Sequence, residues 1–158
     1  MNLEFANAAW LGAEPVIEEA QIAETIETEL LVCGGGVSGL TAWAYACDQG
    51  VKALLIEKSG KLITMRNEVG TINSRIQQKE GVEIDVPELM KQLHMYESGF
   101  TNQALHRLWA AESGAMYDWY QDIVESYGGW VAFQGGYEME MKSGEYSRIP
   151  TGHRAYWP

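Results

Sequence analysis

Basic residues are missing from the first 30 positions of the sequence, which hold seven glutamates and neither lysine nor arginine. The whole chain of 158 residues carries a formal net charge of −11, which argues against nucleic acid or an anionic membrane as a partner. The acidic start also lacks the basic and apolar regions of a secretory signal and the arginine-rich character of a transit peptide. We therefore expect a cytoplasmic protein, or an exported one whose signal has been removed, with residues 1–27 as an acidic lead-in segment.

Cysteine is scarce, and long apolar runs are absent. The two cysteines, Cys33 and Cys47, form no C-x-x-C pair, so neither a metal site nor a redox dithiol is expected. No apolar run approaches the roughly 20 residues that span a bilayer, so we expect no membrane span. The sequence has no nucleophile elbow, no Walker loop and no paired carboxylates, and we assign no catalytic residue and no metal ligand.

Glycine, in contrast, is plentiful and clusters between two apolar runs. Residues 28–32 predict a strand that is buried on both faces, because no polar residues alternate within the apolar part of the run. A glycine-rich turn follows over 34–39, then a helix up to Gly50 and a second strand over 51–56 that stops at an acid. Since a helix of this length returns the chain, we predict that the two strands are parallel. This order is that of a dinucleotide-binding βαβ unit.

Each glycine of the turn has a physical reason in such a unit. Gly34 permits the tight turn, Gly36 lets the backbone approach a pyrophosphate, and Gly39 lets the helix pack closely on the sheet. The N–H groups of the first helical turn, around Val37 and Ser38, have no partner within the helix and face the phosphates. We therefore predict that this turn cradles a diphosphate.

The acid after the second strand narrows the choice of cofactor. Glu57 lies 23 positions after Gly34, close to the roughly 20 expected for the acid that binds a ribose hydroxyl. Its charge would repel a 2′-phosphate, which counts against NADP. Residues 58–85 are polar, punctuated by glycine and without sustained period, and we interpret their backbone as wrapping the cofactor. Two helices follow and no third sheet strand is evident, which favours FAD over NAD.

Two helices are predicted in the second half of the chain. Asp85 can cap the first, and Glu88 three residues later can complete a capping box. Thr101 or Asn102 can cap the second, a long amphipathic helix that ends at residues 128–129.

The end of the chain is predicted to be irregular. Residues 130–133 predict a short strand with residues 137–141 as its hairpin partner, and residues 148–154 predict a polar loop. His153 in this loop is a candidate for touching a ligand. The acids of the long helix follow helical spacing and are interpreted as a solvated face: Asp118, Asp122 and Glu125.

Four blocks of the sequence resemble one family of enzymes. They are ETELLVCGGGVSGL (27–40) with LIEK (55–58), RNEVGTINSR (66–75), DWY (118–120) and PTGH (150–153). In this order they resemble the FAD-binding start of the fumarate reductase/succinate dehydrogenase flavoprotein family. The closer similarity is to the FAD-dependent oxidoreductases of anaerobic bacteria that reduce activated double bonds. The resemblance covers nearly everything from Ala23 onward.

Two departures from that family pattern bear on the site. Family members usually have a small residue at the position of Trp43, so helix–sheet packing there is expected to differ. The usual Gly-Gly-Asn-Ser/Thr is replaced over residues 63–67. Flavin contacts therefore carry over only to Asn67 and the 70–73 region.

The resemblance implies the N-terminal FAD-binding portion of an oxidoreductase, in which hydride passes from FAD to an activated alkene. FAD is expected to be non-covalent, since no attachment histidine stands where some members carry one. The substrate is expected to be a small molecule, handled together with catalysis by residues beyond Pro158, so the fragment alone is expected to be inactive. The alternative is a stand-alone, non-catalytic nucleotide-binding or interaction module.

The expected fold class is α/β, with a Rossmann-like FAD-binding βαβ unit followed by helices and an incomplete parallel sheet. Residues 28–158 are expected to be the N-terminal part of a FAD-binding domain, truncated before the substrate or capping domain is complete. The predicted cofactor-binding residues are Gly34, Gly36, Val37, Ser38, Gly39, Glu57, Lys58, Asn67, Gly70, Thr71, Ile72 and Asn73.

Overall fold

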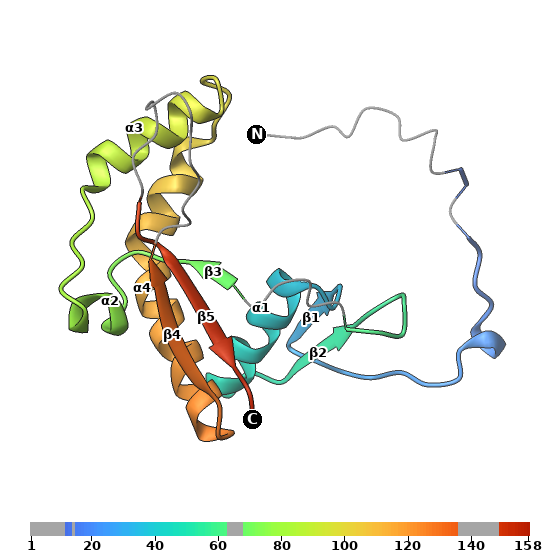
Figure 1. Ribbon diagram of the computed structural model, residues 1–158. Helices are drawn as coiled ribbons and strands as arrows, with labels where there is room; N and C mark the ends of the chain where they lie inside the picture. The colour runs from blue at the N-terminus through green and yellow to red at the C-terminus, as the bar shows by residue number, and fades with distance from the viewer. Residues whose placement is uncertain (1–11, 14, 63–67, 136–148) are drawn as a thin grey trace. The chain divides into compact units, whose positions relative to one another are not determined.

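A computed structural model describes residues 12–13, 15–62, 68–135 and 149–158 (Figure 1). It divides the chain into two compact units, an N-terminal unit up to Ile63 and a C-terminal unit from Thr64. The predicted contact of Asn67 and the predicted strand over 137–141 lie outside the described residues. The prediction of a single domain from residue 28 onward stays a prediction.

The N-terminal unit is a βαβ unit with a parallel sheet, as predicted. It consists of β1 (Leu30–Cys33), α1 (Val37–Asp48) and β2 (Ala53–Ile56). The two strands pair in parallel over their whole length, from Leu30 opposite Ala53 to Cys33 opposite Ile56. Gly50, just after the helix, has the positive φ of 78° that a glycine at a helix end can adopt.

The prediction that the first strand is buried on both faces is wrong. Leu31 is 52% exposed and Ile56 is 48% exposed, and no residue of α1 is fully buried. Each strand has a single hydrogen-bonded neighbour among the described residues, and α1 is the helix that packs on the pair. A parallel sheet needs cover on both faces to bury such apolar side chains, and here the described residues cover them only in part.

The C-terminal unit contains a second sheet, of which the sequence predicted the strand at residues 130–133 but not β3 or β5. Its elements are β3 (Glu68–Gly70), α2 (Arg75–Lys79), α3 (Val86–Tyr96), α4 (Gln103–Ser126), β4 (Trp130–Gly135) and β5 (Gly152–Tyr156). The strands are antiparallel in the order β3-β5-β4, and Figure 1 shows β4 and β5 running along α4. The predicted strand over residues 130–133 is confirmed as part of β4, and among the described residues none of these strands joins the parallel sheet of β1 and β2. The prediction of a polar loop through residue 154 is wrong, because β5 begins at Gly152.

The helices of the C-terminal unit begin at caps that the sequence indicates. The Asp85 carboxylate accepts a hydrogen bond from the Glu88 N–H at 3.0 Å, and the Asn102 side chain accepts one from the Ala104 N–H at 3.1 Å. Both caps satisfy N–H groups that the first helical turn leaves unpaired.

The core of the C-terminal unit lies between its sheet and α4. The His153 ring on β5 lies 4.6 Å from the Tyr117 ring on α4 and 5.4 Å from the Phe133 ring on β4, between centroids. Among the described residues, the buried apolar side chains belong to this unit: Ile72, Leu89, Tyr117, Val124 and Ala155. This arrangement places the β3–α2 loop directly against α4.

Candidate functional site

The glycine-rich turn of the N-terminal unit has the backbone geometry that its sequence predicts. Gly34 has a φ of 114°, which residues with a side chain rarely adopt. A Cβ on Gly39 would overlap the carbonyl oxygen of Gly34, so α1 approaches the turn more closely than any side chain allows. The predicted tight turn and close helix packing are both confirmed.

Gly36, like Gly34 and unlike Gly35 and Gly39, has open space where a side chain would begin, among the described residues. It is the residue before the first turn of α1, and no side chain caps that helix start. A Cβ added at Gly36 would meet no atom of the described residues within 4 Å. Val37 and Ser38, which follow it, are exposed at the start of α1. The helix start is thus free to receive a group from outside the described residues.

Glu57, directly after β2, holds the glycine-rich turn through a hydrogen bond from Gly35, and we call this contact the clamp. Its Oε2 accepts a hydrogen bond from the Gly35 N–H at 2.6 Å, and its Oε1 accepts bonds from the N–H and hydroxyl of Ser59 at 2.8 and 2.7 Å. The bond from Gly35 and then those from Ser59 lower the pKa of Glu57 from 4.5 to about 2. The carboxylate is therefore ionised throughout the neutral range.

The clamp and the Ser59 bonds leave limited capacity for a ligand on Glu57. A carboxylate offers about four acceptor positions, and the three donors above occupy three of them. One position remains for a ribose hydroxyl, and the predicted ribose contact stays a prediction. Lys58, the next predicted contact, is exposed beside it.

The role of Gly35 was missed by sequence reasoning. Its N–H donates to Glu57, and a Cβ there would lie 2.7 Å from Leu62 Cδ2 and 3.2 Å from Glu57 Cβ. The predicted parallel pairing of the two strands could have revealed this contact. In that pairing the Gly34 N–H donates to the Ile56 carbonyl at 2.7 Å, which brings Glu57 beside Gly35.

Trp43 replaces the small residue expected on α1 and makes a contact of its own. Its indole N–H donates to the Ala53 carbonyl at 3.3 Å, which ties α1 to β2. The expectation that helix–sheet packing at this position differs from that of the family stays a prediction.

In the C-terminal unit, the predicted flavin-flanking loop is held from several sides. The Thr71 N–H donates to the Thr151 carbonyl at 2.9 Å, and the Ile72 N–H donates to the Ser113 hydroxyl at 3.0 Å. Gly70, at the end of β3, accepts the indole N–H of Trp109 at 2.9 Å. The side chains of Thr71 and Ile72 are buried, so they contribute to the packing of this unit.

Asn73 is exposed, as Gly70 is at the other end of the loop, and the backbone of Asn73 is strained. Its φ is 65°, which is uncommon for a residue with a side chain and costs of order 1–3 kcal/mol. The Gln78 amide holds it there by donating to the Asn73 carbonyl at 3.0 Å and to its Oδ1 at 3.3 Å. Strain that the surroundings maintain in this way is found preferentially at functional sites.

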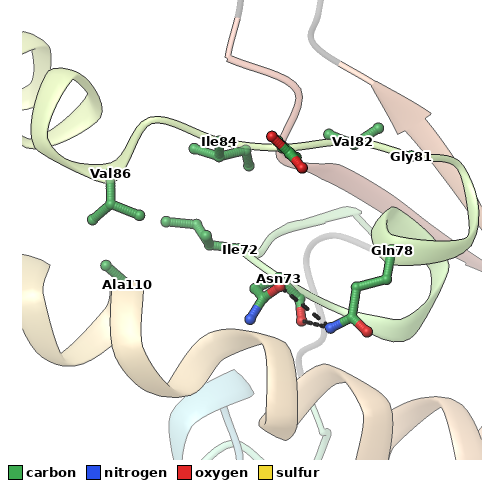
Figure 2. A pocket seen from close by; sticks show the side chains of 9 residues that line it. Ile72, Asn73, Gln78, Gly81, Val82, Ile84, Val86 and Ala110 are labelled. Atoms are coloured by element: carbon green, nitrogen blue, oxygen red, sulfur yellow. Dashed lines mark hydrogen bonds between the residues drawn. The ribbon is translucent and has the colours of Figure 1, made fainter.

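A pocket of about 640 Å³ opens beside Asn73 (Figure 2). It is lined by Ile72, Asn73, Gln78, Gly81, Val82, Glu83, Ile84, Val86 and Ala110. Figure 2 shows Val86, Ile72 and Ala110 at one end and the Asn73–Gln78 pair at the other. Its volume lies in the range of small-molecule sites, and its lining combines apolar walls with a few polar groups, as such sites do.

His153 is not a loop residue but a buried residue of β5. Its side chain is 0% exposed. Its Nδ1 lies 2.7 Å from the Thr151 carbonyl, which can only accept, so Nδ1 carries the proton. Its Nε2, 2.7 Å from the Ser74 hydroxyl, therefore accepts from Ser74. This places His153 in a structural network that joins β5 to the cap of α2.

The burial of His153 predicts a loss of stability in acid. Burial lowers the pKa of His153 from 6.5, against the opposing effect of the Thr151 carbonyl. Because the unfolded imidazole takes up a proton that the buried one resists, the free energy of unfolding should fall as the pH drops below about 6.5. Urea unfolding between about pH 7.5 and 5.5 measures this.

His153→Asn is the matched variant, since an asparagine amide can still donate to the Thr151 carbonyl and does not titrate. Its unfolding free energy should depend less on pH than that of the unchanged protein. Parallel losses in the two proteins would show that His153 is not the group that resists protonation.

The comparisons with known proteins do not identify a family for this chain. No protein-family model matches the chain, and no curated protein matches it either. Among the described residues, no helix is long and apolar enough to cross a membrane. The same residues contain no group of three or more histidine, cysteine, aspartate or glutamate side chains that could hold a metal ion.

Proposed function

We propose that the N-terminal unit binds the diphosphate and adenosine ribose of FAD, non-covalently, in a flavoprotein oxidoreductase similar to the fumarate reductase family. The observation that carries the proposal is the open space beside Gly36, at an uncapped helix start within a parallel βαβ unit. Backbone N–H groups at such a helix start bind phosphate, helped by the helix dipole. When bound, FAD supplies hydride transfer to an activated alkene.

Different residues at the turn would bind different parts of FAD. The N–H groups that follow Gly36, on Val37 and Ser38, would hold the diphosphate, while Gly34 and Gly39 permit the turn itself. Glu57 would hold a ribose hydroxyl through its remaining acceptor position. The ionised state of Glu57 supports this role, because a carboxylate is a stronger acceptor than a neutral acid.

The partial exposure of the apolar sheet supports the proposal that the N-terminal unit is part of a longer flavoprotein. β1 and β2 are apolar, yet Leu31 and Ile56 are about half exposed. Parallel strands of this composition are normally covered on both faces and paired on both edges. We propose that further strands and the catalytic residues of the oxidoreductase complete this unit, which alone holds part of a cofactor site.

Glu57→Ala tests the ribose contact. We expect the Kd for FAD to rise by roughly 5- to 150-fold, because the proposed ribose bond to a charged acceptor is lost together with the Gly35 bond that holds the turn. Titration of the protein with FAD, followed by quenching of the flavin fluorescence, measures the affinity. Release of intact FAD on denaturation checks that the cofactor is not covalently attached.

Two control variants show whether the loss of a Ser59 bond, or the loss of an acidic charge elsewhere, is enough to change the affinity. Ser59→Ala removes one bond to Glu57 and keeps the acid, so FAD affinity should change by less than about twofold. Glu24→Ala removes an exposed acid of the lead-in and should leave the affinity unchanged. An unchanged Kd for Glu57→Ala would reject the ribose role, and absence of FAD binding by the unaltered protein would favour the non-catalytic module.

A further inference from the structure

A second, smaller pocket lies between α3 and α4 of the C-terminal unit. It has a volume of about 310 Å³ and is lined by Met90, Lys91, His94, Gln103, His106 and Arg107. Four of these six side chains are basic or carry an imidazole, in a chain with a formal net charge of −11. Among the described residues, no acidic side chain lines the pocket. This gathering of donors is the feature that the proposed FAD site leaves unexplained.

A chain of hydrogen bonds orients the donors of this pocket. The Arg107 guanidinium donates to Oε1 of Gln103 at 3.4 Å, so the other end of that amide is its nitrogen. This nitrogen lies 3.3 Å from Nδ1 of His94, and an amide nitrogen can only donate. Nδ1 therefore accepts, and the neutral His94 ring carries its proton on Nε2 as a donor.

Arg107 differs from its neighbours in having no carboxylate partner among the described residues. The Lys91 ammonium pairs with Glu88 at 3.2 Å, and the His106 ring pairs with Glu97 at 3.6 Å. Arg107 instead bonds to the neutral amide of Gln103. A guanidinium has five N–H donors, of which this contact uses one, so most of its donor capacity remains available.

We propose that this pocket binds a phosphate dianion, either free or as the terminal group of a small metabolite. Arg107 would supply paired N–H donors, the geometry that matches two phosphate oxygens, and Lys91 would add a positive charge. His94 would donate from Nε2. The pocket volume of about 310 Å³ exceeds that of a single phosphate and leaves room for a small organic group. The proposal concerns other residues than the FAD site and stands or falls separately.

The three histidines of the chain provide the test. In a ¹H–¹³C spectrum of the whole protein, His94, His106 and His153 give three Cε1–Hε1 signals. Titration with inorganic phosphate at constant ionic strength should shift the signals of His94 and His106 saturably. The signal of His153, which is buried on β5, should not move.

Arg107→Gln should weaken phosphate binding about tenfold or more, because a charge-assisted donor pair is lost. Lys79→Gln removes a positive charge from the end of α2, away from the pocket lining, and should change the Kd by less than about twofold. Absence of saturable shifts, equal shifts with chloride, or equal phosphate affinity in Arg107→Gln and the unaltered protein would overturn the proposal.

A comparison of inorganic phosphate with glycerol phosphate identifies the source of the group. Tighter binding of glycerol phosphate would support a small phosphorylated metabolite. Equal or tighter binding of inorganic phosphate would support the free ion. Failure of both to bind would overturn the site, whatever the result with FAD.

Discussion

Replacing Gly39 with alanine is expected to destabilise the N-terminal unit by about 3 kcal/mol and to abolish FAD binding. The added Cβ would overlap the carbonyl oxygen of Gly34, and both are parts of the backbone, which cannot move aside as the end of a flexible side chain can. The turn would have to open, and Gly35 would then lose its 2.6 Å bond to Glu57. Thermal unfolding followed by circular dichroism measures the loss.

Gly36→Ala is the matched variant, because it adds the same methyl group three residues earlier. A Cβ at Gly36 would meet no atom within 4 Å in the part of the chain that the structure describes, and the φ of −79° at Gly36 suits alanine. Stability should therefore change by less than about 0.5 kcal/mol. FAD affinity should nevertheless fall about tenfold or more, because the methyl group would occupy the space proposed for the diphosphate.

The pair of variants separates folding from binding. An unaltered melting temperature for Gly39→Ala would contradict the close packing of α1 on the turn. A stable Gly36→Ala protein that binds FAD as tightly as the original would place the cofactor elsewhere and reject the proposed diphosphate site.

The features that sequence reasoning predicted are those with local causes. The βαβ unit follows from two apolar runs, a turn that needs Gly34 and a helix that Gly50 ends, all within about thirty residues. The starts of α3 and α4 likewise depend on one capping side chain each, Asp85 and Asn102. Such features need no knowledge of which distant segments meet.

The features that sequence reasoning missed all depend on distant contacts. β5 pairs with β3 across more than 80 positions, with Val69 opposite His153, and neither short strand has a distinctive pattern of its own. Burial of His153 follows from that pairing and from α4, so its local polar neighbours misled the prediction. Tertiary contacts, rather than local sequence patterns, thus determine the short strands of the C-terminal unit and the burial of His153.

The acids of α4 illustrate the same limit. Their helical spacing predicts a solvated face but says nothing of their partners. Asp118 accepts a hydrogen bond from the Arg75 backbone N–H at 2.8 Å, and Asp122 accepts one from the Arg75 guanidinium at 2.6 Å. The solvated-face interpretation is confirmed for Asp122, whose side chain is 62% exposed, whereas the side chain of Asp118 is only 25% exposed. Both carboxylates anchor the start of α2. Arg75 is 43 positions away from Asp118, and no periodicity within α4 reveals it.

Replacing Gly114 with alanine is expected to destabilise the C-terminal unit by about 3 kcal/mol. Gly114 lies within α4, where alanine would ordinarily stabilise the helix by about 1 kcal/mol. The added Cβ, however, would overlap the Ile72 carbonyl oxygen and lie 2.8 Å from the Asn73 carbonyl carbon and oxygen. The loop and α4 would have to separate, so the effect should have the opposite sign to helix propensity.

Gly70→Ala is the matched control for this prediction, because its Cβ would meet Thr151 Oγ1 at 3.4 Å, an ordinary contact. Its unfolding free energy in urea, followed by tryptophan fluorescence, should stay within about 0.5 kcal/mol of the unaltered protein. Stabilisation by Gly114→Ala would show that propensity decides the outcome and that the loop does not rest on α4. Destabilisation confined to Gly114→Ala would establish that the strained backbone of Asn73 is held in place by this contact with the helix.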